Sequence, residues 1–368
     1  MAGFNLILPE LNNFITLLGG ADKKGLIIML FSVSAGLSRP FSGKLSDKIG
    51  RKKVIYGGIA LSFIVSLLYP LSYSVAFFLT LRVIHGFSAG FAPTGATALL
   101  TDLIPSTARG KAMGIWGTFI SLGIGAGQAL GSWIYQMAGF NVLFAIASVF
   151  SVIAILIVHN VRETLEKRQK FKPHLLKVKW TDVFEPSVLP AAMVMMLTAT
   201  CSGIIFVVTP DISAFLDIEN KGFFFGIYVI ATVIVRLFTS SLSDKIGRRQ
   251  TMLIGCLILL ISMIVIAETR TYIGYIIGAL IFGLATGVSS PTLFAWTADL
   301  SHEDRRGVGA GTMFIALEIG IMIGSLSTVF TYNNSPDSVH FAFSTGIATA
   351  IIAIIYLIWH LRKKQSAF

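Results

Sequence analysis

The sequence predicts an all-α membrane protein in which twelve helices form two similar bundles of six. Three observations lead to this architecture. Of the 368 residues, 54% are hydrophobic and only 13% are charged, whereas a typical soluble domain carries about 25% charged residues. Apolar runs long enough to cross a bilayer recur along the chain, and the second half of the chain repeats the first half at a fixed offset.

Eleven apolar runs are each long enough to span a membrane. A hydrocarbon core about 30 Å thick requires roughly 20 residues of helix, because each residue adds about 1.5 Å. Buried strands of a soluble protein are a poor alternative, since such strands last only about 4–8 residues between turn signals. The runs lie near residues 25–43, 53–72, 75–99, 111–134, 139–160, 187–208, 222–243, 250–268, 272–295, 307–331 and 339–361.

The links between these runs alternate between nearly neutral and strongly basic. Of the 29 Lys and Arg residues, 22 lie in alternate links or in the C-terminal tail. Because cytoplasmic loops of membrane proteins are enriched in Lys and Arg, we expect these links and both termini on the cytoplasmic side. The net charge of +11 is then a matter of topology in a lipid bilayer, and no nucleic-acid partner is expected.

An internal repeat divides the chain into two units. Residues 39–53 and 236–250 are identical at nine of fifteen positions, at an offset of 197. The same offset relates further pairs: Gly86 and Gly283, Gly90 and Gly287, Asp102 and Asp299, Arg109 and Arg306. We therefore expect an N-terminal six-helix bundle over residues 1–160, a cytoplasmic linker over 161–186 and a C-terminal six-helix bundle over 187–368.

The repeat also predicts that the first helix is incomplete. Residues 8–15 resemble residues 209–216, but about 21 apolar residues precede Pro210 and only eight precede Pro9. We therefore expect the sequence to begin inside its first helix, and restoring that helix gives two sets of six.

Three motifs resemble signatures of one transporter family. Residues 43–53 resemble the loop signature of the major facilitator superfamily, and residues 243–249 are a weaker copy of it. Residues 82–86 resemble the signature of its fourth helix. Residues 123–131 resemble the glycine-rich antiporter signature of its fifth helix, with Gln128 where that signature has proline. The whole pattern is most similar to the bacterial drug:proton antiporter branch.

The resemblance implies a secondary transporter of a bacterial cytoplasmic membrane that moves a small molecule by alternating access. Two similar halves would enclose a central site and rock to expose it to each side in turn. Proton-coupled efflux of an amphipathic compound or drug is the first expectation, and we expect the chain to work as a monomer. Proton-coupled uptake of a sugar, an organic acid or another nutrient is the alternative.

The loop signature also implies a latch between the two halves on the cytoplasmic face. In the family it holds the outward-open state, a role that would fall to Asp47, Arg51 and Asp102. Gly43 would let a helix end approach its neighbour, and Gly50 would supply a tight turn. The alternative is that these charges only fix the topology. The expected latch comprises Gly43, Asp47, Gly50, Arg51, Asp102, Arg109, Asp244 and Arg248.

Charged residues inside the spans are candidates for proton coupling, because a charge at a helix centre costs about 2.5–3.5 kcal/mol on insertion scales. Glu318 lies near the middle of its run and is the expected protonation site. The alternative is a neutral carboxyl group hydrogen-bonded between helices. Arg82 is the expected basic partner that shifts proton affinity in the cavity. Arg39 and Arg236 occupy matched depths in the two halves, where a structural or gating role is expected.

Weaker candidates complete the expected site. The expected substrate contacts are Arg39, Trp116, Gln128, Tyr228 and Trp296. Glu10 and Asp211 follow matched prolines, and they are either gate charges or solvated loop residues.

No enzyme, metal site or cofactor is expected from the motifs. The six His residues are scattered, Cys201 and Cys256 lie in separate apolar runs, and neither an H-E-x-x-H motif nor a P-loop occurs. The longest link has about 27 residues, which leaves no room for a receptor domain.

Overall fold

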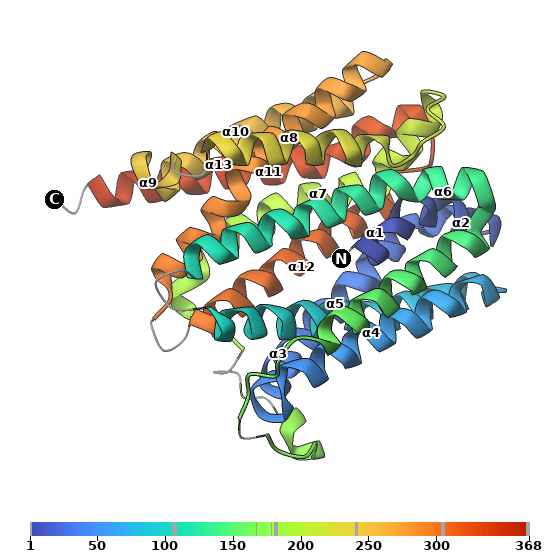
Figure 1. The fold of residues 1–368 in the computed structure, drawn as a ribbon. Coiled ribbons are helices and arrows are strands. Elements are labelled where there is room, and N and C mark those ends of the chain that lie inside the picture. The colour runs from blue at the N-terminus through green and yellow to red at the C-terminus, as the bar shows by residue number, and fades with distance from the viewer. Residues whose placement is uncertain are drawn as a thin grey trace.

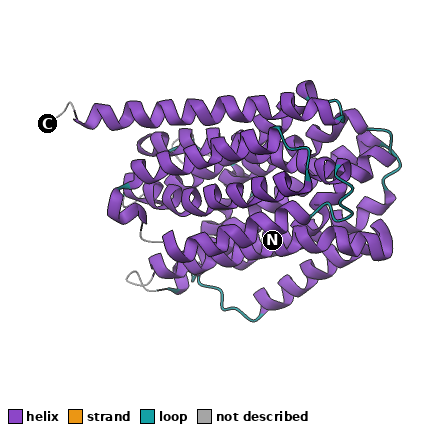
Figure 2. Cartoon of the chain, turned by 90° about the horizontal axis from the view of Figure 1, so that it is seen from above, coloured by secondary structure: helices purple, strands orange, loops and turns teal. Residues whose placement is uncertain are grey.

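The computed structural model describes residues 2–104, 109–166, 168–177, 179, 183–239, 242–302 and 306–365. Every regular element in these ranges is a helix (Figure 2). The long helices run side by side along a common direction (Figure 1). This arrangement confirms the predicted all-α architecture.

The first half of the chain contains two short and four long α-helices. Its first piece is bent: α1 and α2 are separated by the 3₁₀ turn η1 at Leu8–Glu10. Helix α6 has 51 residues and is broken at Gly139, where φ is 74° and ψ is −176°, so it contains two of the predicted runs. The helices are α1 (Ala2–Ile7), α2 (Leu11–Leu17), α3 (Lys24–Ile49), α4 (Arg51–Leu68), α5 (Val75–Leu103) and α6 (Arg109–His159).

The second half contains six longer α-helices and the short α9 in its described part. Between the halves, residues 160–188 carry only the short 3₁₀ turns η5 (Pro173–Leu176) and η7 (Pro186–Val188) in their described part. The helices are α7 (Leu189–Phe215), α8 (Phe223–Thr239), α9 (Leu242–Ile246), α10 (Arg248–Ala267), α11 (Tyr272–Leu300), α12 (Arg306–Thr331) and α13 (Val339–Gln365).

Nine helical segments of the described chain are long and apolar enough to cross a membrane. One of them, within α6, covers 45 residues, which is enough for two crossings because about 20 residues suffice for one. Helix α8 is a shorter apolar helix, and the bent α1–α2 piece is shorter still. The chain is therefore a multi-pass membrane protein.

The two ends of the bundle differ in charge. We call the end that holds Gly50, Gly247 and the 160–186 segment the basic face. The end that holds Gly19, Gly139 and residues 216–222 is called the neutral face. Gly50 has φ of 123° and Gly247 has φ of 94°, a backbone conformation that favours glycine over other residues. The repeated motif therefore makes the same sharp turn twice on the basic face.

The halves meet through specific helix pairs. Helix α3 packs against α12, α6 packs against α8, and the first piece of the chain touches α7. Within each half the repeated glycines lie in equivalent close contacts. Gly86 approaches the backbone of α3 at Phe31, and Gly283 approaches the backbone of α8 at Tyr228.

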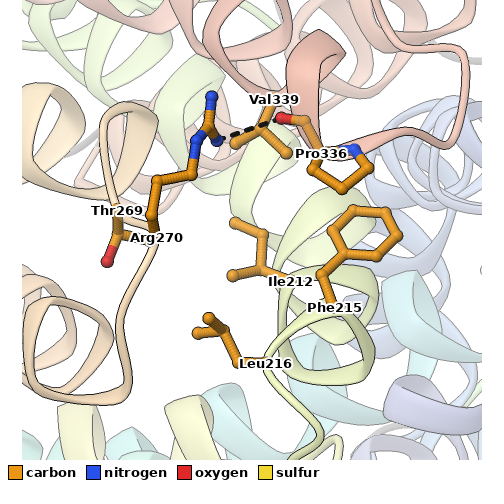
Figure 3. A pocket seen from close by; sticks show the side chains of 7 residues that line it. All are labelled: Ile212, Phe215, Leu216, Thr269, Arg270, Pro336 and Val339. Carbon is orange, nitrogen blue, oxygen red and sulfur yellow. Dashed lines mark hydrogen bonds between the residues drawn. The ribbon is translucent and has the colours of Figure 1, made fainter.

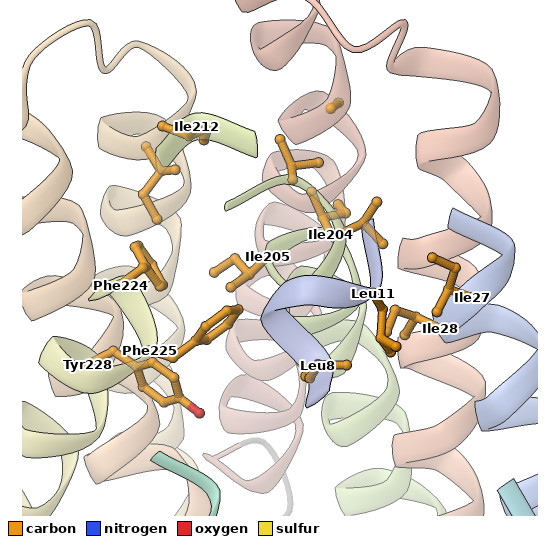
Figure 4. Packing of buried hydrophobic residues seen from close by; sticks show 14 of the residues in the cluster. Leu8, Leu11, Ile27, Ile28, Ile204, Ile205, Ile212, Phe224, Phe225 and Tyr228 are labelled. Carbon is orange, nitrogen blue, oxygen red and sulfur yellow. The ribbon is translucent and has the colours of Figure 1, made fainter. Parts of the chain in front are cut away.

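One apolar core joins the two halves toward the neutral face. It contains Leu8, Leu11 and Ile28 from the first half and Ile205 and Phe225 from the second half (Figure 4). In Figure 4, Leu11 lies beside Ile28, and Ile205 lies between the helix that carries Leu11 and Phe225. Inside a bilayer such helix contacts are stabilised mainly by van der Waals packing, because lipid tails are as apolar as these side chains. The contact between the halves is therefore lined by closely packed apolar side chains at this level.

Toward the basic face the cores of the two halves separate. A second cluster, which includes Val188, Met195, Trp296 and Leu357, draws only on helices of the second half. A small third cluster of Leu45, Val54 and Leu175 belongs to the first half and its following segment. The halves are thus joined at the neutral face and have separate cores at the basic face.

Close packing of α6 against α1 gives a stability prediction. A Cβ atom at Gly131 would meet the backbone carbonyl of Leu6, whereas a Cβ atom at Gly117 on the same helix would meet nothing within 4 Å. Gly131→Ala should therefore lower stability by about 1–3 kcal/mol, the usual cost of overpacking. Gly117→Ala should be neutral or stabilising, because Ala is the better helix former.

Thermal unfolding in detergent checks this prediction through the thiols of Cys201 and Cys256, which are free and buried. A thiol-reactive dye should label them at a lower temperature in the Gly131 variant only. Equal melting temperatures for the two variants would contradict the packing described here.

Candidate functional site

The predicted protonation site lies between the two halves. Arg39 Nη2 of α3 lies 2.8 Å from Glu318 Oε1 of α12, and the two side chains are only 12% and 9% exposed. The Arg39 guanidinium also lies 4.6 Å from the ring centre of Phe314. Helices α3 and α12 approach closely here, because the Glu318 side chain lies against Gly36. A buried ion pair therefore links the halves partway along α3 and α12.

Arg82 lies elsewhere, within the packing of the first half. Its Nε donates to the carbonyl of Ile27 at 3.2 Å and its Nη1 donates to the Tyr69 hydroxyl at 3.2 Å. The guanidinium stacks 4.6 Å from the ring centre of Phe31, and the side chain is fully buried. The expectation that Arg82 is the basic partner in the cavity is not supported, since the group paired with Glu318 is Arg39. Arg82 is held instead by a carbonyl, a hydroxyl and an aromatic face.

Arg236 occupies the position in the second half that matches Arg39. Its Nη1 donates to the Ser121 hydroxyl at 2.8 Å and to the Gly117 carbonyl at 3.2 Å. The offset of 197 that relates Arg39 to Arg236 also relates Ser121 to Glu318. The same cross-half contact therefore occurs twice, with a carboxylate on one side and a hydroxyl on the other.

A cavity of about 160 Å³ lies beside Arg236, between α6, α7, α8 and α11. Tyr228, one of the predicted cavity residues, lines it. Aromatic rings and hydroxyl groups share the rest of the wall, a composition that suits an amphipathic ligand. The lining residues are Ser121, Ile124, Ser202, Phe206, Tyr228, Val229, Thr232, Arg236, Phe282, Thr286 and Ser290.

Two of the other predicted cavity residues are buried in helix packing instead. Gln128 is fully buried and donates to Asn5 at 3.1 Å, which ties α6 to α1. Trp296 belongs to the apolar core of the second half. Trp116 is partly buried and is not among the described residues that line the cavity. Tryptophan and glutamine inside a span thus serve packing here.

A second, smaller cavity of about 80 Å³ lies at the neutral-face end of the second half. Figure 3 shows Arg270 at its edge, where Nη1 donates to the Pro336 carbonyl at 3.0 Å. Its walls come from α7 and from the links beside α11 and α13. Because it lies within one half, this cavity is not a candidate for alternating access.

The basic face carries two copies of one ion-pair arrangement. Arg51 pairs with Asp47 one turn away and with Asp102 at 3.0 Å. Arg248 likewise pairs with Asp244 and, at 2.8 Å, with Asp299. The repeat seen in the sequence therefore reappears as matched three-residue clusters.

Each cluster lies within one half. In the first half, Glu163 accepts from the backbone amides of Arg51 and Lys52, both at 3.1 Å, and so caps the start of α4. A Cβ atom at Gly43 would meet nothing within 4 Å, so the close approach predicted there does not occur in this conformation. The side chain of Arg109 lies outside the described residues.

The sequence matches the Major Facilitator Superfamily over residues 1–219 and 192–368, two overlapping segments that together span the chain. The chain belongs to the Major Facilitator Superfamily. The protein with these basic-face clusters is thus a transporter of this superfamily.

Drug-resistance proteins are among the relatives of this superfamily member. It is 28% identical to the Quinolone resistance protein NorA of Staphylococcus aureus (strain MRSA252) over 204 residues, which cover 54% of the chain and 52% of NorA. The matched chain thus spans about half the length of NorA. Multidrug resistance protein 2 of Bacillus subtilis (strain 168) is 23% identical, and the match covers 99% of this chain and 93% of that protein.

A solved superfamily structure shares the fold. The human organic anion transporter MFSD10 (TETRAN) superposes with a TM-score of 0.73 at 20% identity, covering 97% of this chain and 95% of that one. At this level of identity the likeness concerns the fold alone.

The neutral face of the transporter holds a buried polar cluster that joins the halves. Lys24 Nζ of α3 lies 2.5 Å from Asp211 Oδ2 of α7, and the two side chains are only 11% and 8% exposed. Tyr332 donates to the same carboxylate oxygen at 2.9 Å, and Asn12 donates to the Val207 carbonyl at 2.6 Å. Burial and the adjacent carboxylate raise the pKa of Tyr332, so its hydroxyl stays protonated and donates. Asp211 is therefore a contact between the halves and not a solvated loop residue.

Glu10 is also buried, and it accepts from Ser132 at 2.6 Å and from Asn13 at 2.8 Å. Burial lowers the pKa of the neighbouring Lys221, although the charges of Glu10 and Asp211 oppose that shift. Sequence reasoning identified both acids but missed Lys24, Asn12 and Ser132. Lys24 stands at the start of its helix, where a lysine is typical of a solvated loop. Its partner Asp211 is 187 residues away in the sequence.

The neutral-face pair gives a matched test. Lys24→Gln removes the cation that is paired directly with the buried Asp211, and breaking a buried pair in this way costs about 3–5 kcal/mol. Lys23→Gln removes a neighbouring cation whose pair with Asp22 is exposed, and such pairs contribute about 0–1 kcal/mol. The Lys24 variant alone should therefore open the neutral face.

Distances between spin labels at Tyr73 and Tyr272 measure this opening, because both residues are exposed at the neutral ends of opposite halves. Native cysteines would be replaced first. A longer-distance population should appear in the Lys24 variant and not in the Lys23 variant. Identical distributions in both variants would show that the pair does not hold this face closed.

Proposed function

We propose that this transporter exports an amphipathic small molecule in exchange for protons. The single observation that carries the proposal is the buried ion pair between Arg39 and Glu318, which joins the two halves inside the membrane. The names of the drug-resistance relatives support export of drug-like compounds. The cavity of aromatic and hydroxyl side chains supports an amphipathic substrate.

The ion pair offers a physical route for coupling. When Glu318 binds a proton it loses its charge, and the attraction that holds α3 to α12 is lost with it. Arg39 is then left buried without a counter-charge, which is unfavourable in a low-dielectric interior. Proton binding would thereby favour a conformation in which the halves have moved. A ligand or proton can shift a two-state equilibrium only through such a difference between states.

The basic face is proposed to be cytoplasmic, because it collects most of the Lys and Arg residues. The described polar contacts between halves extend from the middle of the membrane to the neutral face, so this conformation would open toward the cytoplasm. Drug loading from inside is the step that such a conformation serves. We propose a monomer with both termini on the cytoplasmic side.

The basic-face clusters are proposed to act as the latch in the opposite conformation. Asp47, Arg51 and Asp102 now satisfy one another within the first half, and Asp244 and Arg248 do so in the second half. When the basic ends approach, these exposed charges become available for contacts across the halves. A latch must form and break in each cycle, so a contact energy of a few kcal/mol suits a two-state change.

Glu318→Gln tests the proposal directly. Glutamine keeps the size and hydrogen bonding of the side chain but does not titrate, so transport driven by a pH gradient should be lost while folding is retained. The matched control is Glu268→Gln, which changes an exposed acid paired with His340 on the neutral face and should leave transport intact.

The assay is uptake and release of fluorescent dyes and labelled nutrients in proteoliposomes at several imposed pH gradients. Export in exchange for protons predicts that substrate moves in the direction opposite to proton flow. Proton-coupled nutrient uptake predicts that substrate moves in the same direction as the protons. Unchanged gradient-driven transport by the Glu318 variant at every pH would remove Glu318 from the mechanism.

A further inference from the structure

We propose that Arg236 is an anion-binding group of the cavity, and that the preferred substrates carry a carboxylate beside an aromatic ring. The inference rests on the proposed transport function, whose substrate class it specifies. It starts from a difference between the two halves at one repeated position.

The contact between the halves occurs in two copies, and only one copy pairs opposite charges. Arg39 faces the carboxylate of Glu318, whereas its counterpart Arg236 faces the hydroxyl of Ser121 and the carbonyl of Gly117. Within the described ranges, no carboxylate lies within 4.0 Å of the Arg236 guanidinium. The Nε of Arg236 is buried and has no hydrogen-bond partner there. This arginine therefore keeps both an uncompensated charge and a free donor.

An uncompensated arginine in a membrane interior is a strong attractor for anions. Its guanidinium stays charged at any physiological pH, so it cannot relieve the imbalance by losing a proton. Charges interact far more strongly at low dielectric than in water. Its planar set of donors also matches the two oxygens of a carboxylate. A carboxylate that enters this space would take the role that Glu318 plays on the other side.

The walls of the same cavity indicate what accompanies the carboxylate. The Tyr228 and Phe282 rings lie in edge contact with their centres 5.3 Å apart, and Phe206 lines the cavity with them. Thr232 and Thr286 are hydrogen-bonded to each other at 2.8 Å. These rings offer stacking surfaces within reach of the cation. The arrangement fits an aromatic acid better than an aromatic cation, which Arg236 would repel.

Binding of three probes to the purified full-length protein tests the proposal. Naphthalene-2-carboxylate, naphthalene-2-carboxamide and naphthalen-2-ylmethylammonium share one ring system and differ in charge. The wild-type chain should bind the carboxylate at least about tenfold more tightly than the amide, because hydrogen bonds to charged groups are about twice as strong as neutral ones. Arg236→Gln should bring that ratio close to one.

A second pair of variants tests the same point without removing the arginine. Ser121→Glu places a carboxylate where the other half has Glu318, so it should neutralise Arg236 and abolish the preference for the acid. Ser121→Gln adds similar bulk without charge and should retain the preference. Arg270→Gln removes a guanidinium that does not line the cavity beside Arg236, so this variant should also retain the preference for the acid.

The outcomes separate the two proposals. A carboxylate preference that persists in both Arg236→Gln and Ser121→Glu would overturn the anion site, and so would equal binding of acid and amide by the wild-type chain. If Arg236→Gln loses the acid preference and still exports a cationic dye, both proposals stand. Absence of any gradient-driven export by the wild-type chain would overturn the transport function while leaving the binding result to be judged on its own.

Discussion

A charge inside a membrane protein is costly unless it has a partner, and two ion pairs that meet this cost join the halves of the transporter. Arg39 and Glu318 satisfy each other across the two halves, and Lys24 and Asp211 do so nearer the neutral face. Both pairs need helices from opposite halves to be in contact. The geometry that neutralises the charges is therefore the geometry that holds the halves together. Any event that changes one of these charges also changes the free energy of the contact.

The duplicated chain applies this constraint twice with different results. On the basic face the two copies agree, since Arg51 and Arg248 each bind an acid one turn away and a second acid on the following long helix. At the middle of the membrane they differ, because Ser121 stands where symmetry calls for a second Glu318. The scaffold is symmetric but its interior is not, because Glu318 and the uncompensated Arg236 both belong to the second half.

Much of the fold could be predicted from the sequence because the signals are local. Long apolar runs, basic links and the repeat at residues 39–53 and 236–250 need no knowledge of tertiary contacts. The break at Gly139 and the turns at Gly50 and Gly247 follow from residues that tolerate positive φ. What the sequence could not supply is which helices of opposite halves meet.

The candidate site shows that limit clearly. Glu318 is recognisable in the sequence as an acid in mid-span, but its partner Arg39 is 279 residues away, and the sequence points to Arg82 instead. Arg82 contacts the Tyr69 hydroxyl, a backbone carbonyl and the Phe31 ring, neutral groups that no charge pattern reveals. The amphipathic ring of Trp296 predicts a cavity position, yet it packs in the core of one half.

Single-molecule energy transfer across the basic face tests the central claim that two rigid halves rock about a proton-sensitive contact. Labels at Lys53 and Gln250 suit this measurement, because both residues are exposed and are related by the repeat. The account predicts a low-transfer state that corresponds to the conformation described here and a high-transfer state with the basic ends together, in proportions that change with pH. A single transfer value that does not respond to pH would contradict it.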